Sequence, residues 1–166
     1  MDKLSIDDFL GLRKIKAICD YQFDPEITDI LFSNKKDIHI ERSKNTNKIR
    51  YIYSQDKLLL TLRPNNGFFT LSLFSAEILI ENTKSPKLRA VVPTEISEFI
   101  KKGRNVFCKH IINIDETLRP MDEVIIVNQN DELLAIGRLK LPVPYVKTFK
   151  NGVAIKVRKG INKSKD

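Results

Sequence analysis

The segment from Phe99 to Leu141 constrains the fold most strongly, because its apolar residues form short runs and each run is separated from the next by residues typical of turns. The first run contains Val106, Phe107 and Ile111, and the second covers Val124 to Val127. Runs of this length, bounded by turn signals, are typical of strands rather than helices. We therefore expect a small β-rich domain in this half of the chain. The turn after the second run is 128–131, and the third run is 133–141.

A short helix is predicted to precede these strands. Pro93 and Thr94 supply a start signal, and Gly103 stands where a left-handed cap is expected. Lys101 and Lys102 fall in the last turn, where the helix dipole favours cations. We expect this helix end to expose backbone N–H groups at the glycine, where a phosphate backbone can approach closely.

The last strand is predicted from Gly152 to Arg158, with side chains that alternate between its two faces. One face is apolar and is expected to join the core, whereas the other points Lys156 and Arg158 to solvent. The residues that follow the strand are predicted to fray. The apolar face consists of Val153, Ile155 and Val157, and the polar tail is 159–166.

The first half of the chain predicts two helices followed by antiparallel strands. Ser5 is a good helix cap and Asp8 completes a capping box, so a helix is expected from Ser5 to about Cys19. Asp24 and Pro25 start a second, short helix. Alternating apolar runs then predict strands joined by tight turns. The predicted strands are 38–42, 49–53, 58–63 and 68–74, and residues 78–80 are either a further strand or a helix end.

The composition indicates a folded protein with an acidic partner. The 166 residues, 42% of them hydrophobic and 30% charged, suffice for one ordinary domain or two small ones. The net charge of +8 favours a nucleic acid, although a lysine-rich surface explains it equally well. Cys19 and Cys108 lie far apart among apolar residues, which predicts reduced thiols and a cytoplasmic protein. The N-terminal residues do not resemble a signal peptide, and no apolar run is long enough to span a membrane.

Few residues are suited to catalysis or metal binding. Two acidic pairs, Asp122–Glu123 and Asp131–Glu132, flank predicted turns, so we expect solvated carboxylates rather than catalytic ones. His110 follows a strand and is expected to be half exposed. Because His39 and His110 are both isolated and no paired-cysteine motif occurs, neither a metal site nor a cofactor is predicted.

The second half of the chain resembles a PUA domain, the small RNA-binding barrel of pseudouridine synthases and archaeosine transglycosylases. The resemblance consists of an ordered series of motifs rather than a single one. The motifs are Lys102-Gly103-Arg104, Val106-Phe107, Leu118-Arg119-Pro120, Asp122-Glu123-Val124, the run 132–138 and the closing strand 152–158.

The first half resembles the domain that precedes the PUA domain in archaeal archaeosine tRNA-guanine transglycosylases. The two resemblances together cover nearly the whole chain, but only the C-terminal region of that enzyme. They imply an α+β fold, with a pre-PUA α+β domain at residues 1–86 and a PUA-type β-barrel at residues 87–166. The motifs of the first half are Ala17-Ile18, Tyr21-Gln22-Phe23, Ser43, Thr46, Lys48-Ile49-Arg50, and the runs 60–64 and 67–71.

The resemblance implies a tRNA-binding, non-catalytic subunit, because the catalytic barrel, aspartates and zinc ligands of the family have no counterpart here. A TIM barrel alone needs about 250 residues. The implied partners are the acceptor stem and CCA end of tRNA and a separate catalytic transglycosylase chain, but neither DNA nor a membrane. The candidate RNA-binding residues are Lys101, Lys102, Gly103, Arg104, Asn105, Lys109, Arg138, Lys156 and Arg158.

Two other functions stay open at this point. The chain fits a free-standing RNA-binding protein that acts on the ribosome or in translation. It also fits a subunit of the later amidotransfer step of archaeosine synthesis, because those enzymes share the same C-terminal domains.

The sequence departs from the resembled family between Leu139 and Tyr145. The transglycosylases usually place a short helix there, whereas Pro142 and Pro144 disfavour one. An extended or turn conformation is therefore predicted, and an RNA contact from this segment is not assumed.

Overall fold

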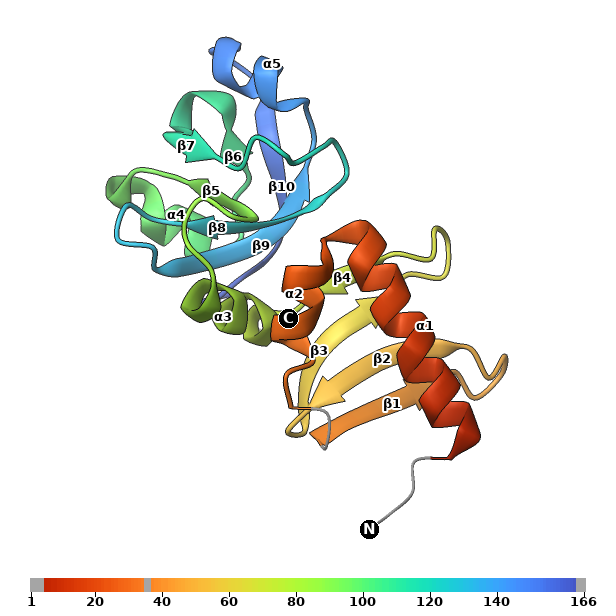
Figure 1. Ribbon diagram of the computed structural model, residues 1–166. Coiled ribbons are helices and arrows are strands. Elements are labelled where there is room, and N and C mark those ends of the chain that lie inside the picture. Colours follow the sequence, from red (N-terminus) through yellow and green to blue (C-terminus); the bar gives the residue numbers. More distant parts are fainter. Residues whose placement is uncertain (1–4, 35–36, 164–166) are drawn as a thin grey trace. The chain divides into compact units, whose positions relative to one another are not determined.

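The computed structural model describes residues 5–34 and 37–163 and shows an α+β protein (Figure 1). Helices and sheets occur in both halves of the chain, so the predicted fold class is confirmed. The chain forms two compact units, which divide between Leu79 and Ile80. The domain boundary between residues 86 and 87 stays a prediction. None of the helices in the described ranges is long and apolar enough to cross a membrane.

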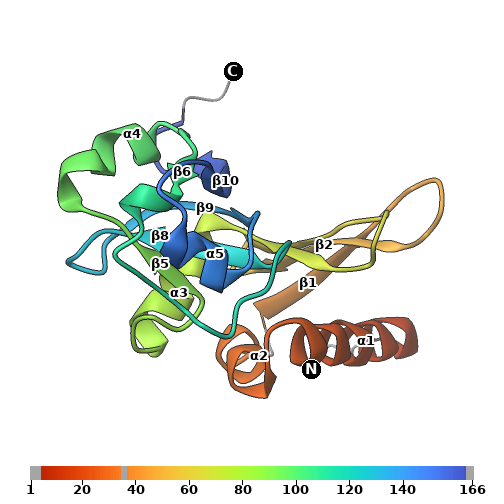
Figure 2. The same cartoon turned by 90° about the horizontal axis from the view of Figure 1, so that it is seen from above.

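Two helices and a four-stranded antiparallel sheet form the first unit. The helices are α1 (Ile6–Gln22) and α2 (Pro25–Leu31), and α1 lies along one face of the sheet (Figures 1 and 2). The sheet order β1-β2-β3-β4 pairs each strand with its neighbour in sequence. Ile52 and Leu60 face each other across β2 and β3 and are fully buried. The strands are β1 (Ile38–Arg42), β2 (Ile49–Ser54), β3 (Lys57–Leu62) and β4 (Phe69–Leu71).

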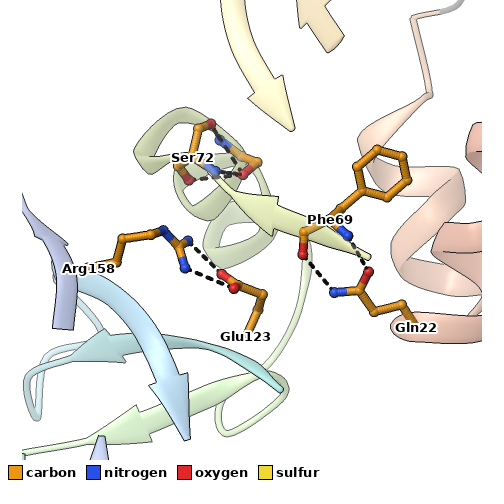
Figure 3. A network of polar contacts seen from close by, with 6 residues as sticks. Gln22, Phe69, Ser72, Glu123 and Arg158 are labelled. Atoms are coloured by element: carbon orange, nitrogen blue, oxygen red, sulfur yellow. Dashed lines mark hydrogen bonds and ion pairs between the residues drawn. The ribbon is translucent and has the colours of Figure 1, made fainter. Parts of the chain in front are cut away.

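The predicted caps of both helices are confirmed. The Ser5 hydroxyl accepts a hydrogen bond from the Asp8 amide at 3.1 Å, and the Asp24 carboxylate accepts one from the Ile27 amide at 2.8 Å. Helix α1 runs past its predicted end because the Gln22 side chain binds strand β4. Its Nε2 donates to the Phe69 carbonyl at 2.8 Å, and its Oε1 accepts from the Phe69 amide at 2.7 Å (Figure 3). A hydrogen-bonding side chain therefore continues the helix beyond Cys19, where the pattern of apolar residues predicted its end.

The strand predicted over residues 68–74 is wrong in its second half. Strand β4 stops at Leu71, and helix α3 (Leu73–Asn82) begins two residues later. The reason is a reciprocal cap: the Ser75 amide donates to the Ser72 hydroxyl at 3.0 Å, and the Ser72 amide donates to the Ser75 hydroxyl at 2.8 Å (Figure 3). Residues 78–80 are therefore helical, which decides between the two predicted alternatives.

A curled, six-stranded mixed sheet forms a half-barrel in the second unit. The strand order is β6-β10-β9-β8-β5-β7, in which β5 runs parallel to β8 and the other pairs are antiparallel. The strands are β5 (Arg89–Val91), β6 (Val106–Phe107), β7 (Asn113–Ile114), β8 (Glu123–Val127), β9 (Leu133–Leu139) and β10 (Val153–Gly160). The connections contain the 3-10 turns η2 (Thr94–Ile96) and η3 (Cys108–His110) and the helices α4 (Ser97–Lys101) and α5 (Val143–Thr148).

Strand β8 is the centre of this sheet, and all five of its residues are buried. Val124, Ile125, Ile126 and Val127 are completely buried, so both faces of the strand are covered. Burying one such side chain contributes about 1.5–3 kcal/mol relative to leaving it exposed. The predicted apolar run is confirmed as the core of this unit.

The prediction that residues 139–145 avoid a helix is wrong. Helix α5 starts directly after Pro142, which has the extended backbone of an N-cap residue, and Pro144 occupies its first turn. Proline is tolerated there because the amides of the first turn lack partners within the helix. The two prolines therefore start this helix rather than prevent it.

Arg89 is completely buried at the start of the second unit, where its side chain binds several backbone carbonyls. Its Nη2 donates to the carbonyls of Ile80 and Thr83, both at 3.0 Å, and its Nη1 donates to the carbonyl of Lys87 at 3.2 Å. Its Nε lies 2.9 Å from a carboxylate oxygen of Asp131. Burial lowers the pKa of Arg89, and the carboxylate of Asp131 opposes that shift. The guanidinium thus satisfies carbonyls at the end of α3 that the helix leaves free.

Replacing Arg89 with methionine should lower the free energy of unfolding by about 3 kcal/mol. The substitution leaves the carbonyls and the carboxylate that Arg89 contacts without a partner. Urea denaturation measures this loss. Arg119→Met is the matched control, since Arg119 is exposed and should change stability by less than about 0.5 kcal/mol. Equal effects of the two substitutions would contradict the role of the buried guanidinium.

Candidate nucleic-acid interface

The loop after α4 forms a tightly bonded corner around Gly103. Gly103 has φ +93°, which confirms the predicted left-handed cap. The Gly103 amide donates to the Ile100 carbonyl at 2.9 Å, and the Arg104 amide donates to the Phe99 carbonyl at 3.2 Å. This pair of bonds is a Schellman motif. The prediction of exposed amides at the glycine is therefore wrong, because the helix carbonyls already bind them. The amides of Gly103 and Arg104 are therefore not available to an anion.

The residues after β10 wrap the same corner. The Asn162 amide donates to the Lys101 carbonyl at 3.0 Å, and a Cβ on Gly103 would lie 3.4 Å from Cδ of Lys163. A Cβ on Gly160 would lie only 2.0 Å from the Lys101 carbonyl oxygen, so only glycine fits there. Residues 160–163 are therefore held against the corner rather than frayed, whereas residues 164–166 lie outside the described ranges. Lys163 is an additional cation at this corner, and its place in the presumed tail concealed it from sequence reasoning.

Asn105 has a positioning role in this corner. Its Oδ1 accepts a hydrogen bond from the Val157 amide at 3.0 Å, beside an irregularity in the pairing of β10 with β9 between Val157 and Lys159. A bulge leaves backbone amides without ladder partners. Asn105 thereby fixes the loop to strand β10, and this use of its side-chain oxygen was not visible in the sequence.

The cations on the strands are only partly available for a ligand. Lys156 is exposed and lies opposite Arg138 across β10 and β9, whereas Arg138 is half-buried. Arg158 donates from both terminal nitrogens to the Glu123 carboxylate, at 2.8 and 2.6 Å (Figure 3). The expectation that Arg158 points freely to solvent is therefore wrong. A forked, charge-assisted pair of this kind holds the guanidinium in one orientation.

The acidic residues of the two predicted turns are engaged in the structure. Glu123 is 1% exposed, so its expected solvation is wrong. Asp122 is half-buried and accepts from the Arg119 amide at 2.8 Å, and burial raises the pKa of Asp122. Glu132 accepts from the Asn128 side chain at 2.5 Å. These carboxylates stabilise turns and strands.

The remaining predictions from isolated residues are simple to compare with the structure. His110 is half-buried, as expected. Cys19 and Cys108 are buried and free, as expected, and burial together with Asp20 raises the pKa of Cys19 to about 12. Within the described ranges, no group of three or more His, Cys, Asp or Glu residues could hold a metal ion.

The candidate residues thus lie in three places. The corner holds five of them, from Lys101 to Asn105, and Lys101 is paired there with Glu98 at 3.0 Å. Lys109 lies beyond β6 in the η3 turn, and the others lie on β9 and β10. The exposed cations among the candidates are Lys102, Arg104, Lys109 and Lys156.

Both units match known protein families. Residues 13–86 match the model of the patch-forming domain C2 of tRNA-guanine transglycosylase, and residues 89–161 match the model of the PUA domain. The chain is therefore a two-domain protein in which a transglycosylase C2 domain precedes a PUA domain. It is homologous to the C-terminal region of the archaeal tRNA-guanine(15) transglycosylases. The resemblance found in the sequence is confirmed.

Curated relatives extend well beyond the matched region. The chain is 43% identical over 152 residues to the tRNA-guanine(15) transglycosylase of Methanobrevibacter smithii, which covers 92% of the chain and 23% of the relative. It is 40% identical over 156 residues to the same enzyme of Methanothermobacter thermautotrophicus, which covers 94% and 23%. The chain thus spans about a quarter of the length of these relatives.

Solved structures share the fold at low sequence identity. A hypothetical protein of Pyrococcus horikoshii OT3 superposes with a TM-score of 0.74 at 23% identity, over 93% of this chain and 92% of that one. A PUA domain protein of Thermoplasma acidophilum superposes with a TM-score of 0.63 at 15% identity, over 94% and 91%. These likenesses support the fold and nothing further.

Replacing Gly160 with alanine should destabilise the chain by about 3 kcal/mol, because the new Cβ forces the Lys101 carbonyl away. Gly152→Ala is the control: Gly152 has φ +103° but open space around it, so about 1 kcal/mol is expected. Urea denaturation compares the two variants. Amide exchange of Asn162 should accelerate in the Gly160 variant alone, and unchanged exchange there would contradict the wrapped corner.

Proposed function

We propose that this chain is the tRNA-binding, non-catalytic part of an archaeosine tRNA-guanine transglycosylase. The Gly103 corner binds the acceptor stem and CCA end of the tRNA and positions it for a separate catalytic chain. The observation that carries this proposal is the fixed corner with its exposed side chains, Lys102 and Arg104, in a chain that combines a C2 domain with a PUA domain.

The geometry of the corner supports a phosphate contact through side chains. The Schellman motif fixes the backbone, so the two cations project from a rigid base and lose little freedom on binding. Arg104 offers a forked donor that matches a phosphate, and Lys102 offers a compact charge. Such contacts read the shape and backbone of an A-form helix rather than its sequence.

Two of the acids at the predicted turns support a non-catalytic role. Glu123 is bound to Arg158, and Asp131 is bound to Arg89. A general acid or base needs a carboxyl group within reach of a substrate, and these carboxylates are committed to arginine. The base exchange named for the relatives would take place on another segment of polypeptide, because a catalytic TIM barrel needs about 250 residues.

A second candidate function is a free-standing RNA-binding protein that acts on the ribosome. It is favoured by the PUA domain at residues 89–161, which supports RNA binding without requiring a catalytic partner. Co-sedimentation with ribosomal particles, rather than with tRNA, would favour this second function. Tritiated-guanine exchange into tRNA separates the two candidates: exchange by the catalytic chain that proceeds unchanged without the present chain contradicts the first.

The double variant Lys102→Glu/Arg104→Glu should bind tRNA about tenfold or more weakly than the wild type, because two phosphate contacts become repulsive. The slope of log affinity against log salt should fall by about 2. Fluorescence anisotropy with labelled tRNA across a salt series measures both quantities.

The matched control for this variant is Lys44→Glu/Arg119→Glu, which changes the net charge equally at exposed positions that do not belong to the corner. It should leave the salt slope nearly unchanged. Removing the CCA end from the tRNA should weaken wild-type binding as well. Wild-type affinity of the corner variant for intact tRNA would overturn the proposed site.

A further inference from the structure

A cluster of exposed aromatic side chains lies on helix α5 and at the end of β6, beside the start of β10. It consists of Phe107, Tyr145 and Phe149, which are 44%, 52% and 45% exposed, and we call it the aromatic cluster. Phe107 pairs with Val153 at the first residue of β10, whereas Gly160 at the last residue contacts the corner. Four residues of chain lead from Gly103 to Phe107, so the nearest edge of the cluster lies within about 14 Å of the corner.

The two rings on α5 form a parallel stack that faces outward. The ring centroids of Tyr145 and Phe149 are 5.3 Å apart and their planes differ by 3°. Helix α5 is anchored to the unit by Val143 and Val146, which are 5% and 2% exposed. The aromatic rings are therefore not needed to hold the helix. Two large rings left in water without a covering partner indicate a binding surface.

Two adjoining hollows lie beside Phe149 and Phe107. One of about 570 Å³ lies between the η3 turn and the end of α5, and its lining includes Phe149. The other, of about 290 Å³, is lined by Phe107, His110 and Gly152. Lys109 and Lys150 line both hollows, so they stand between the rings of α5 and the ring of Phe107.

The charge around the aromatic cluster is strongly positive. Lys109, Lys147 and Lys150 line the hollows, together with His110. The neighbouring acid Glu116 forms an ion pair with Lys147, which lowers the pKa of Glu116. The lining residues themselves include no acid. An occupant of these hollows therefore carries negative charge as well as flat apolar groups.

We propose that the aromatic cluster binds unpaired nucleotides of an RNA, with bases stacked on Tyr145 and Phe149 and phosphates held by Lys109 and Lys150. Flat aromatic platforms beside cations are the surface on which single-stranded nucleic acids bind with little sequence preference. The lysines that line the hollows, without an acid among the lining residues, favour a nucleic acid over a protein segment. The inference rests on the proposed RNA-binding function, but it adds a contact centred on α5, outside the Gly103 corner.

The test uses the full chain and two RNA probes. The first probe is a single-stranded oligo-adenosine of about eight nucleotides that carries 2-aminopurine, whose fluorescence falls when it stacks. The second is a blunt-ended RNA hairpin without unpaired ends. The wild type should bind the oligonucleotide with quenching of 2-aminopurine. Tyr145→Leu/Phe149→Leu, which keeps apolar side chains but removes both rings, should weaken that binding about tenfold or more and abolish the quenching.

Three controls make the outcome decisive. Tyr21→Leu removes another exposed ring, stacked on Phe68 in the first unit, and should change neither probe. Lys109→Glu/Lys150→Glu leaves α5 intact and should also weaken oligonucleotide binding about tenfold, with a flatter salt dependence. The aromatic variant should bind the hairpin as the wild type does.

The results separate this inference from the proposed function. Oligonucleotide binding and quenching that survive in the aromatic variant overturn the inference, including the case in which this surface binds a protein instead. If the Lys102→Glu/Arg104→Glu variant binds the hairpin normally while the aromatic variant loses the oligonucleotide, the proposed corner is wrong and the aromatic cluster stands.

Discussion

The candidate interface depends on the bonds that strand β10 and the residues after it make with the loop after α4. Asn105 accepts from the Val157 amide, and the Lys101 carbonyl accepts from the Asn162 amide. Each bond is worth only about 1 kcal/mol, but together they fix a short loop at both of its ends. Without these bonds, the loop that follows the Schellman motif at Gly103 would not be held against strand β10. With them, the corner becomes a rigid base from which Lys102 and Arg104 project.

Charge in this protein is divided between structural and exposed roles. Arg89 and Arg158 are each committed to an acid, and the acid next to Arg158 is completely buried. Breaking such a buried pair costs far more than an exposed pair contributes. The total of 29 lysines and arginines therefore overstates the number of cations that a nucleic acid can contact. The exposed lysines and arginines, rather than the total, define the candidate interface.

Local sequence signals identified most elements because their causes are local. Ser5 and Asp24 cap helices through bonds to amides three residues away, and Gly103 adopts the positive φ that its position after a cationic helix end predicts. The apolar run of β8 is the core of its sheet. The same local reasoning failed at Ser72 and at Pro142. At Ser72 a hydrogen-bonded cap starts a helix inside a segment that resembles a strand, and at Pro142 the backbone conformation starts one inside a segment that resembles a loop.

The sequence by itself determined the α+β class, the position of the main helices and strands, and the family resemblance, because these depend on periodicity, caps and ordered motifs. Only the tertiary structure decided which cations are exposed. Glu123 lies in a strand beside residues that are 15 positions away, and its partner Arg158 is 35 positions away, so no local pattern reveals the pair. Likewise, residues 160–163 looked like a frayed tail, but they wrap the Gly103 corner because β10 ends beside Lys101. Contacts between distant residues depend on how the sheet curls. Hydrogen bonds between the strands fix that curl only when the whole unit has folded.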